Sequence, residues 1–188
     1  VISDVVKSDA RDAIAALKRA GVQKTVMLTG DIQRVADHVA QELGVDEVHA
    51  ELLPGDKVAQ VERLLGEKGK DDCLAFVGDG INDAPALAYA DVGISLGSKS
   101  TDIAMETSDV VINRDDPMMI PELRRLARAT MRIVQQNFAM VIGINTVGLI
   151  LGAASGISVL ASALMHNMST ILVVANSLRL MVFPPMEG

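Results

Sequence analysis

The 188-residue sequence is poor in aromatic side chains and cysteine, and both shortages limit what it can do. It has no Trp, one Tyr and three Phe, so it lacks the aromatic surfaces on which proteins stack single-stranded bases. Its net charge of −7 also argues against a nucleic-acid surface, which needs clustered Lys and Arg. The single cysteine, Cys73, cannot form an internal disulfide, and we expect a small buried residue in a reducing, cytosolic setting.

Charged side chains are absent from one long stretch. Residues 133–178 contain no Asp, Glu, Lys or Arg. A helix needs roughly 20 apolar residues to cross a hydrocarbon layer of about 30 Å, so this stretch is long enough for two crossings. The alternative is a buried helical hairpin in a soluble protein, but such helices normally keep a charged face. We therefore predict two transmembrane helices, at about residues 137–155 and 158–180.

Basic side chains flank the charge-free stretch. They are Arg124, Arg125, Arg128, Arg132 and Arg179. Residues 117–188 carry 5 Lys/Arg against 2 Asp/Glu, a net of +3, whereas residues 1–116 carry 12 against 22, a net of −10. Because basic residues favour the cytosolic side of a membrane, both ends of the hairpin and the domain before it are predicted to be cytosolic. The protein is then an integral protein of the plasma (inner) membrane.

The first 116 residues alternate helical and strand-like patterns. Helices are predicted over residues 9–20, 32–43, 54–68 and 84–90, and strands over 24–28, 47–50, 74–77, 92–95 and 110–112, with 74–77 a buried strand. This alternation is typical of a parallel sheet flanked by helices. We predict an α/β domain over residues 1–116, a basic connecting helix over 117–136, the membrane hairpin over 137–182 and a cytosolic tail over 183–188.

Two polar loops follow strands of this predicted sheet. Thr29-Gly30-Asp31 follows one strand, and Gly78-Asp79-Gly80-Ile81-Asn82-Asp83 follows another. Ligands bind at the carboxyl ends of the strands in such sheets, so the two loops are expected to share one site. Mg²⁺ prefers oxygen ligands and commonly takes one or two carboxylates. Asp79 and Asp83 offer these within one short loop.

Other groups near these loops suit phosphoryl transfer. Gly78 and Gly80 let the backbone approach a phosphate, and Asn82 can hydrogen-bond a phosphate or hold a carboxylate. Lys57 can supply positive charge. The Thr29 hydroxyl and N–H, at a helix start, suit a phosphate oxygen. Each feature also has a structural alternative, since Thr-Gly-Asp is a common helix cap, a single Lys is usually solvated, and Asp-Gly is ordinary turn sequence.

Five segments together resemble the P-type ATPases and, in the last case, their heavy-metal-transporting branch. They are Met27-Leu28-Thr29-Gly30-Asp31, Leu53-Pro54-Gly55-Asp56-Lys57, Gly78-Asp79-Gly80-Ile81-Asn82-Asp83-Ala84-Pro85-Ala86-Leu87, Ala90-Asp91-Val92-Gly93-Ile94 and Asn176-Ser177-Leu178-Arg179-Leu180. The resemblance implies the second half of a haloacid-dehalogenase-like phosphorylation domain followed by the last two membrane helices. It also implies an ion-translocating ATP hydrolase that works through an aspartyl-phosphate, with ATP as substrate and Mg²⁺ as cofactor.

The resemblance assigns roles to individual residues. Asp79 would bind Mg²⁺, and Asp83 and Asn82 would support the site. Thr29 would bind the phosphoryl oxygens, and Lys57 would stabilise their charge. The Asp-Lys-Thr-Gly-Thr motif of the family, whose Asp accepts the phosphate, is absent from this sequence. We therefore expect the isolated chain to be inactive and its partner to be the remainder of the same pump polypeptide.

The charge-free stretch holds candidates for binding the transported ion. His166 is its one titratable side chain, and intramembrane polar residues mark pathways by default; imidazole suits Zn, Co, Ni and Cu. Ser169 and Thr170 share its helical face, and Asn145 is the central polar residue of the preceding helix. For Ser169 and Thr170, hydrogen bonds between helices are the favoured alternative.

The segment around His166 bears on the identity of the ion. His166-Asn167-Met168-Ser169-Thr170 resembles the His-Glu-Gly-Gly-Thr pattern of cobalt-type members of the family, with three departures. Met165 and Met168 suit Cu(I), but Met is also common packing material. We expect export of a divalent transition-metal cation (Zn/Cd/Co-like), with copper as the alternative.

Two other functions remain open at this stage. A membrane-anchored phosphatase of the haloacid-dehalogenase type would need its own nucleophile, and Asp4 is the candidate, although it lacks the Asp-x-Asp form. A non-enzymatic chain that binds only Mg²⁺ or partner subunits is the other. Sequence preceding Val1 would separate these functions from the pump.

Overall fold

The computed structural model describes residues 8–78, 81–97, 106–156 and 158–184. The chain divides into two compact units, Val1–Pro121 and Glu122–Gly188. The first unit contains the strands, and the second consists of helix.

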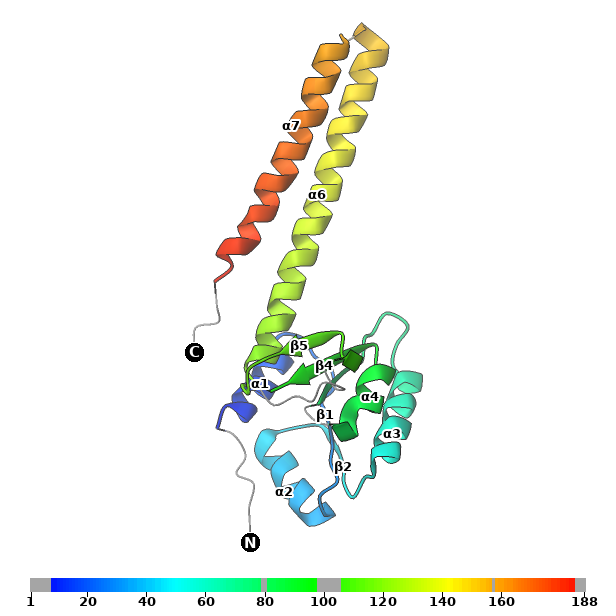
Figure 1. The fold of residues 1–188 in the computed structure, drawn as a ribbon, viewed down its shortest axis with the longest axis vertical. Helices are drawn as coiled ribbons and strands as arrows, with labels where there is room; N and C mark the ends of the chain where they lie inside the picture. The colour runs from blue at the N-terminus through cyan, green and yellow to red at the C-terminus, as the bar shows by residue number, and fades with distance from the viewer. Residues whose placement is uncertain (1–7, 79–80, 98–105, 157, 185–188) are drawn as a thin grey trace. The chain divides into compact units, whose positions relative to one another are not determined.

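Strands and helices alternate along the first unit (Figure 1). In chain order they are α1 (Ser8–Arg19), β1 (Val26–Leu28), α2 (Gln33–Leu43), β2 (Glu47–His49), α3 (Pro54–Glu67), β3 (Ala75–Gly78), the 3₁₀ helix η1 (Ile81–Asp83), α4 (Ala84–Tyr89), β4 (Val92–Leu96) and β5 (Val110–Ile112). This order confirms the predicted α/β class of strands alternating with flanking helices.

The described strands form two sheets, and every pairing in them is parallel. One sheet has the order β1-β2, with Val26 opposite Glu47. The other has the order β3-β4-β5. Within the described residues, no strand pairing joins the two sheets. The prediction of a buried strand at 74–77 was wrong, because β3 lies at a sheet edge and Val77 is 38% exposed.

Local sequence signals account for the ends of the helices. Gly44 ends α2 with a left-handed φ of 72° and donates its N–H to the carbonyl of Ala40, as glycine does at helix C-termini. Pro54 opens α3, where its missing N–H costs nothing. The side chain of Asp56 accepts the N–H of Leu53 at 2.9 Å and so satisfies one free amide at that end.

The core of the first unit combines alanines with branched apolar side chains. Ala36, Ala86 and Leu87 are at most 1% exposed. A Cβ on Gly93 of β4 would lie 2.4 Å from the carbonyl oxygen of Leu87 in α4. That distance leaves no room for any side chain, so Gly93 allows α4 to lie directly on β4.

Ion pairs connect the ends of these elements. Asp46 accepts from the Thr25 hydroxyl and N–H and from Lys18, and these bonds, that of Lys18 first, lower its pKa to about 2. Asp91 accepts the N–H of Leu74 at 2.8 Å and pairs with Lys68 at 3.1 Å. These bonds lower the pKa of Asp91 and attach the end of α3 to the start of the second sheet.

Cys73 lies in the loop before β3 and is exposed. The expectation of a buried cysteine was wrong, because the sequence around it forms a surface connection between α3 and an edge strand.

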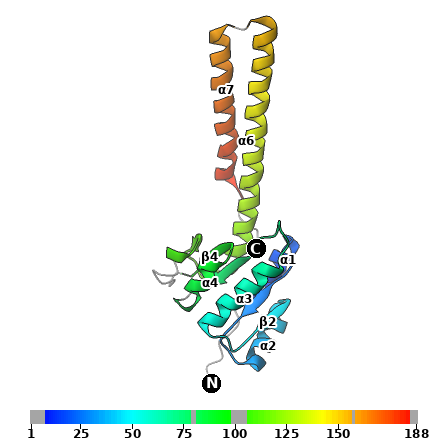
Figure 2. The ribbon, with the colours of Figure 1, turned by 90° about the vertical axis from the view of Figure 1, so that its right-hand side faces the viewer.

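The second unit is a pair of antiparallel helices that lie side by side in both views (Figures 1 and 2). Its elements are α6 (Met119–Ser155), α7 (Val159–Ser177) and the 3₁₀ helix η2 (Leu178–Val182). Gly156, with φ of 63°, follows α6, and the hydroxyl of Ser158 caps α7. The predicted connecting helix and the predicted first span are parts of the single helix α6.

Among the described residues, α6 is the one helix that is long and apolar enough to cross a membrane. Its apolar window is not buried within the structure, and Phe138 and Leu149 are 66% and 75% exposed. A crossing by α7 stays a prediction.

Neutral polar side chains join α6 to α7 close to their charged ends. Asn137 donates to the hydroxyl of Ser177 at 2.9 Å, and Asn176 donates to the amide oxygen of Asn137, also at 2.9 Å. Arg179 donates to the amide oxygen of Asn176 at 3.1 Å. The conspicuous Asn176-Ser177 pair of the sequence is thus an interhelical clasp, by which we mean Asn137, Asn176 and Ser177.

Candidate phosphoryl-transfer site

Thr29 lies immediately after β1, and its side chain is held by Asp31. The Thr29 hydroxyl donates to the Asp31 carboxylate at 3.0 Å, and it accepts the N–H of Asp31 at 3.1 Å. The predicted alternative of a helix cap was wrong, because Ile32 occupies the cap position of α2 and no side chain bonds there. The Thr29 N–H donates to the carbonyl of His49 at 2.9 Å, so the amide and the hydroxyl proton of Thr29 both have partners within the chain.

The segment after β2 holds the Thr29 loop in place, which sequence patterns did not indicate. Glu51 donates its N–H to the carbonyl of Asp31 at 2.8 Å, and Leu52 donates to the carbonyl of Thr29 at 3.1 Å. Glu51 has a positive φ of 56°, which is uncommon for a non-glycine residue. A Cβ on Gly30 would approach the Leu52 carbonyl oxygen to 3.3 Å, so glycine suits this close approach of two loops.

Lys57 and Asp83 form the central ion pair of the site. The ammonium of Lys57, in the first turns of α3, lies 2.7 Å from the carboxylate of Asp83, at the end of η1. Their side chains are only 16% and 14% exposed, so water screens the pair less than it screens a surface pair. Because α3 follows β2 and η1 follows β3, this pair joins the loops at the carboxyl ends of both sheets.

Gly78 is needed because the side chain of Asp83 lies against it. A Cβ on Gly78 would lie 2.8 Å from the Asp83 Cβ and 2.9 Å from its Oδ2. Gly78 is buried at the end of β3. The glycine therefore sets the position of the Asp83 carboxylate as well as the shape of the loop.

The predicted site residues are partly brought together. Gly30 and Asp31 are exposed beside Thr29, and Asn82 is exposed in η1. No hydrogen bond or ion pair joins Thr29 or Asp31 to Lys57 or Asp83, over the part of the chain that the structure describes. Asp79 and Gly80, like the alternative nucleophile Asp4, lie outside the described residues. Within the described ranges, no three His, Cys, Asp or Glu side chains cluster as metal ligands.

The polar residues of the helical hairpin bond differently from the prediction. The hydroxyls of Ser169 and Thr170 donate to the carbonyl of His166 within α7, at 2.7 and 3.3 Å. The predicted bonds between helices were wrong for these two residues, because Ser and Thr inside a helix can reach the carbonyl three or four positions back. Ser169 is buried, whereas the side chains of His166, Thr170 and Asn145 are exposed.

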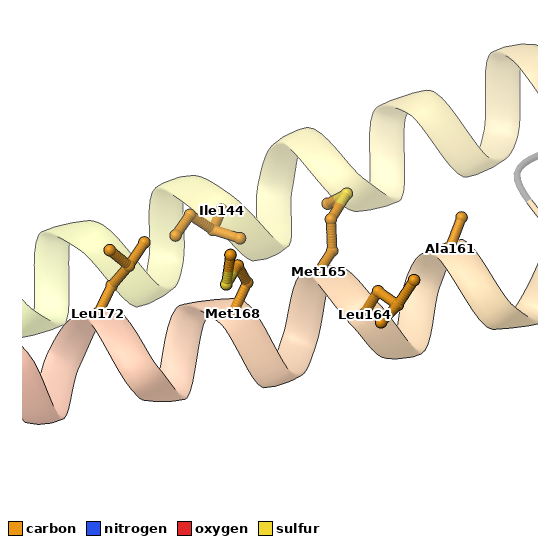
Figure 3. A pocket seen from close by; sticks show the side chains of 6 residues that line it. All are labelled: Ile144, Ala161, Leu164, Met165, Met168 and Leu172. Atoms are coloured by element: carbon orange, nitrogen blue, oxygen red, sulfur yellow. The ribbon is translucent and has the colours of Figure 1, made fainter.

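The two methionines near His166 line an apolar groove between α6 and α7 (Figure 3). Its lining consists of Ile144, Ala161, Leu164, Met165, Met168 and Leu172, and the drawn side chains contain only carbon and sulfur. The methyl group of Met165 would be 2.7 Å from a Cβ on Gly148. Met165 therefore packs against the backbone of the facing helix, which is the ordinary use of Met in apolar surroundings.

Known proteins resemble this chain over nearly all of its length. Residues 1–91 match the haloacid dehalogenase-like hydrolase family. The chain is 46% identical over 182 residues to a cadmium, zinc and cobalt-transporting ATPase of Bacillus subtilis, covering 96% of the chain and 26% of that protein. It is 42% identical to a manganese-exporting P-type ATPase of Mycobacterium bovis, covering 95% of the chain and 24% of that protein.

A solved structure extends the likeness to the fold. The crystal structure of a zinc-transporting PIB-type ATPase matches with a TM-score of 0.86 and 39% identity, covering 95% of this chain and 28% of that one. The chain is a homologue of the heavy-metal-transporting P-type ATPases. It spans about a quarter of the length of these ATPases. ATPases of this class use Mg²⁺ and ATP, and they are integral membrane proteins.

Proposed function

We propose that this chain is part of an ATP-driven heavy-metal cation pump that works through an aspartyl-phosphate. The chain contributes the Mg²⁺/phosphate site and part of the ion path. The observation that carries the proposal is the Lys57–Asp83 ion pair, which joins the strand-end loops of two parallel sheets in a homologue of heavy-metal ATPases. Loops at the carboxyl ends of parallel strands are where such folds bind ligands.

Each residue of the site has a task in this proposal. The Thr29 hydroxyl donates to Asp31 in this structure, and in the loaded site it would donate to a phosphoryl oxygen instead. The Lys57 ammonium has three donors, of which Asp83 takes one, so it can also stabilise charge on the phosphoryl group. Asn82, exposed in η1, can donate to the same oxygens or support a carboxylate.

The donor set at Asp83 suits Mg²⁺. Mg²⁺ takes oxygen ligands, usually one or two carboxylates together with waters and substrate phosphate. Asp83 provides one carboxylate held against Gly78, and Asp79 supplies the second in this proposal. When bound, the ion would neutralise phosphoryl charge. Gly78 fixes the position of the Asp83 carboxylate, and Lys57 lies close to that carboxylate.

The proposal seats the phosphate-accepting aspartate of the pump between the two sheets. Among the described strands, β1 pairs only with β2, and β3 pairs only with β4. The loops after β1 and β3 carry Thr29 and Asp83. A strand from the remainder of the pump, seated between β1 and β3, would end between these two loops and present its aspartate to both.

The cargo in this proposal is a divalent transition-metal cation that is exported from the cytosol. The relatives are named for zinc, cadmium, cobalt or manganese, and His166 supplies a ligand suited to such ions. Packing of Met165 in the groove gives no support to a copper site there. The proposal also includes a second membrane crossing by α7, a plasma (inner) membrane location, and a cytosolic first unit.

Phosphorylation of the intact pump tests this function. With radiolabelled ATP, Mg²⁺ and transported metal, Asp79→Ala should abolish the acid-stable phosphoenzyme. Asp71→Ala is the control, since it removes an exposed carboxylate of the loop before β3. Normal phosphoenzyme in the Asp79 variant would refute the assignment. Stimulation of ATP hydrolysis only by alkali or alkaline-earth ions would refute the heavy-metal cargo.

A further inference from the structure

The second unit carries concentrated positive charge on helices with very few acidic residues. Residues 123–186 contain five Arg and no Lys, Asp or Glu. Four of the arginines precede the apolar part of α6, and Arg179 follows α7. A positive cluster on helices with so few carboxylates suits an anionic ligand.

Arg125 has partners within the same unit. The guanidinium of Arg125 lies 4.8 Å from the ring centre of Phe183, and it donates to the carbonyl of Pro184. Arg125 therefore attaches the end of the chain after η2 to the start of α6. This contact places both charged ends of the hairpin at the same level.

Arg128 and Arg132 have no such partner. Both side chains are exposed, and neither makes an ion pair or hydrogen bond within the described residues. Four residues apart on α6, they are neighbours on one face of the helix. The next position of this row is Gln136, whose side chain accepts a hydrogen bond from Asn176. The row therefore faces the end of α7.

Arg179 lies at the same level as Arg132. Asn176 meets Gln136 and Asn137 across the helix pair. From this contact, Arg179 lies three residues further along η2, and Arg132 lies four residues back along α6. These steps correspond to about 6 Å in each case, at about 2 Å per residue in a 3₁₀ helix and 1.5 Å in an α-helix. Arg179 is exposed and donates to Asn176.

These heights correspond to the headgroup layer of a bilayer. From Ile133 to Ser155, α6 rises about 34 Å, which spans a hydrocarbon core of about 30 Å. Arg132 then lies at the boundary, and Arg128 lies about 6 Å further out. A headgroup layer is about 5–7 Å thick on each side, so both guanidinium groups fall within it.

We propose that Arg128, Arg132 and Arg179 form a binding site for the phosphate of an anionic phospholipid at the cytosolic side of the hairpin. Guanidinium groups match phosphate geometry through paired N–H donors. Exposed apolar side chains of α6, such as Phe138, would contact the acyl chains of the same lipid. The proposal rests on the proposed membrane insertion and names a ligand that the pump function does not require.

Lipid retention by the intact pump tests the proposal. The purified protein is equilibrated in detergent micelles with equal amounts of phosphatidylglycerol and phosphatidylcholine, and after repurification the bound lipids are counted by class. Wild-type protein should retain phosphatidylglycerol in excess. Arg128→Gln with Arg132→Gln should reduce that preference by about fivefold for each arginine. A second variant, Arg128→Lys with Arg132→Lys, keeps the charge but loses the paired donors, so it should retain only part of the preference.

Matched controls separate the possible outcomes. Arg11→Gln with Arg34→Gln removes the same charge from exposed positions on α1 and α2 and should leave the lipid preference unchanged. Equal retention of both lipids by wild-type protein, or an unchanged preference in the Gln variant, would overturn the site. Displacement of phosphatidylglycerol by millimolar inorganic phosphate would identify a free-phosphate site instead. Release of the pump from cell membranes without detergent would contradict membrane insertion itself, which is a failure of the proposed function.

Discussion

The two units of this chain connect their elements with different chemistry. In the first unit, charged pairs such as Lys18–Asp46, Lys57–Asp83 and Lys68–Asp91 join loops to helices. In the second, the bonds between α6 and α7 come chiefly from neutral amides and a hydroxyl, those of the interhelical clasp. Arg179, at the edge of the hairpin, is the charged member beside them.

The difference follows from the surroundings of each unit, which are water for the first unit and, in the proposed function, hydrocarbon for the second. In water, an exposed ion pair costs little to form and contributes at most about 1 kcal/mol. In hydrocarbon, a charged group is expensive, whereas an amide pair satisfies its own donors and acceptors. Charge in the first unit can therefore be used both for structure and for chemistry, and the Lys57–Asp83 pair does both.

The largest predicted effect comes from removing the charge of Lys57, which serves both the structure and the chemistry of the site. Lys57→Met in the intact pump should lower the rate of phosphoenzyme formation by roughly 10²–10³-fold, because it removes a charge that stabilises the phosphoryl group. The substitution also leaves the Asp83 carboxylate without its partner at 14% exposure, which lowers stability. The rate is measured by rapid quench with labelled ATP, and stability by the midpoint of thermal unfolding.

Two further variants separate chemistry from folding in this experiment. Adding Asp83→Asn to Lys57→Met should restore part of the thermal stability without restoring phosphorylation. Lys70→Met, at an exposed position after α3, should behave as wild type. If Lys57→Met forms phosphoenzyme at the normal rate, Lys57 is a structural partner of Asp83 only.

A second prediction concerns the contact between Gly78 and Asp83. Gly78→Ala should destabilise the protein by about 1–3 kcal/mol, as overpacking does, and should slow phosphorylation, because the new Cβ must displace Asp83. Gly66→Ala is the matched control. Gly66 lies in α3 with nothing within 4 Å of a Cβ, so alanine there should add about 0.5–1 kcal/mol. Equal effects of the two substitutions on thermal unfolding would contradict this account.

Part of this site could be predicted from sequence because it lies in local signals. Glycine-rich loops after apolar runs predicted that Thr29 and Asp83 follow strands. Pro54 and Gly44 correctly predicted helix boundaries. Glu51 could not be found this way. Glu51 holds the Thr29 loop through its backbone N–H, and its own φ is positive. A glutamate side chain predicts neither of these backbone properties.

Exposure was the other property that sequence patterns predicted poorly. Val77 belongs to an apolar run typical of a buried strand, yet β3 ends its sheet and leaves Val77 partly exposed. Ser169 and Thr170 have the residue types of interhelical bonds, but each bonds within α7. In both cases the sequence pattern predicts the type of element correctly. Burial and hydrogen bonding depend on which other elements pack beside it, and this is set by tertiary structure.

A third prediction tests the neutral chemistry of the hairpin. Asn176→Ala removes the donor to Asn137 and the acceptor of Arg179, and it should destabilise the pump in mixed micelles by about 0.6–1.7 kcal/mol. Asn167→Ala is the control, because Asn167 is an exposed amide on the same helix. Both are measured by reversible unfolding in mixed micelles. If Asn167→Ala costs as much as Asn176→Ala, the clasp has no special role.

The smallest predicted effect concerns the charge network of the first unit at acidic pH. Glu47 pairs with Lys24 and Arg63 and contacts His49, and these bonds, that of Lys24 first, lower its pKa from 4.5 to about 2. A carboxyl whose pKa is lowered in the folded state stabilises that state above the unfolded pKa. This contribution is therefore complete above about pH 5 and is lost as pH falls through the range from 4.5 to 2.

Glu47→Gln removes the charge and so measures this contribution directly. At pH 7 the variant should be less stable than wild type by about 1 kcal/mol or less, because water screens these partly exposed groups. The difference should shrink as pH falls from 4.5 towards 2, where the wild-type carboxyl is also neutral. Glu62→Gln, which removes an exposed carboxylate of α3, should show no such pH dependence. A constant difference between Glu47→Gln and wild type across this range would mean that packing of the side chain, and not its charge, supports the first sheet.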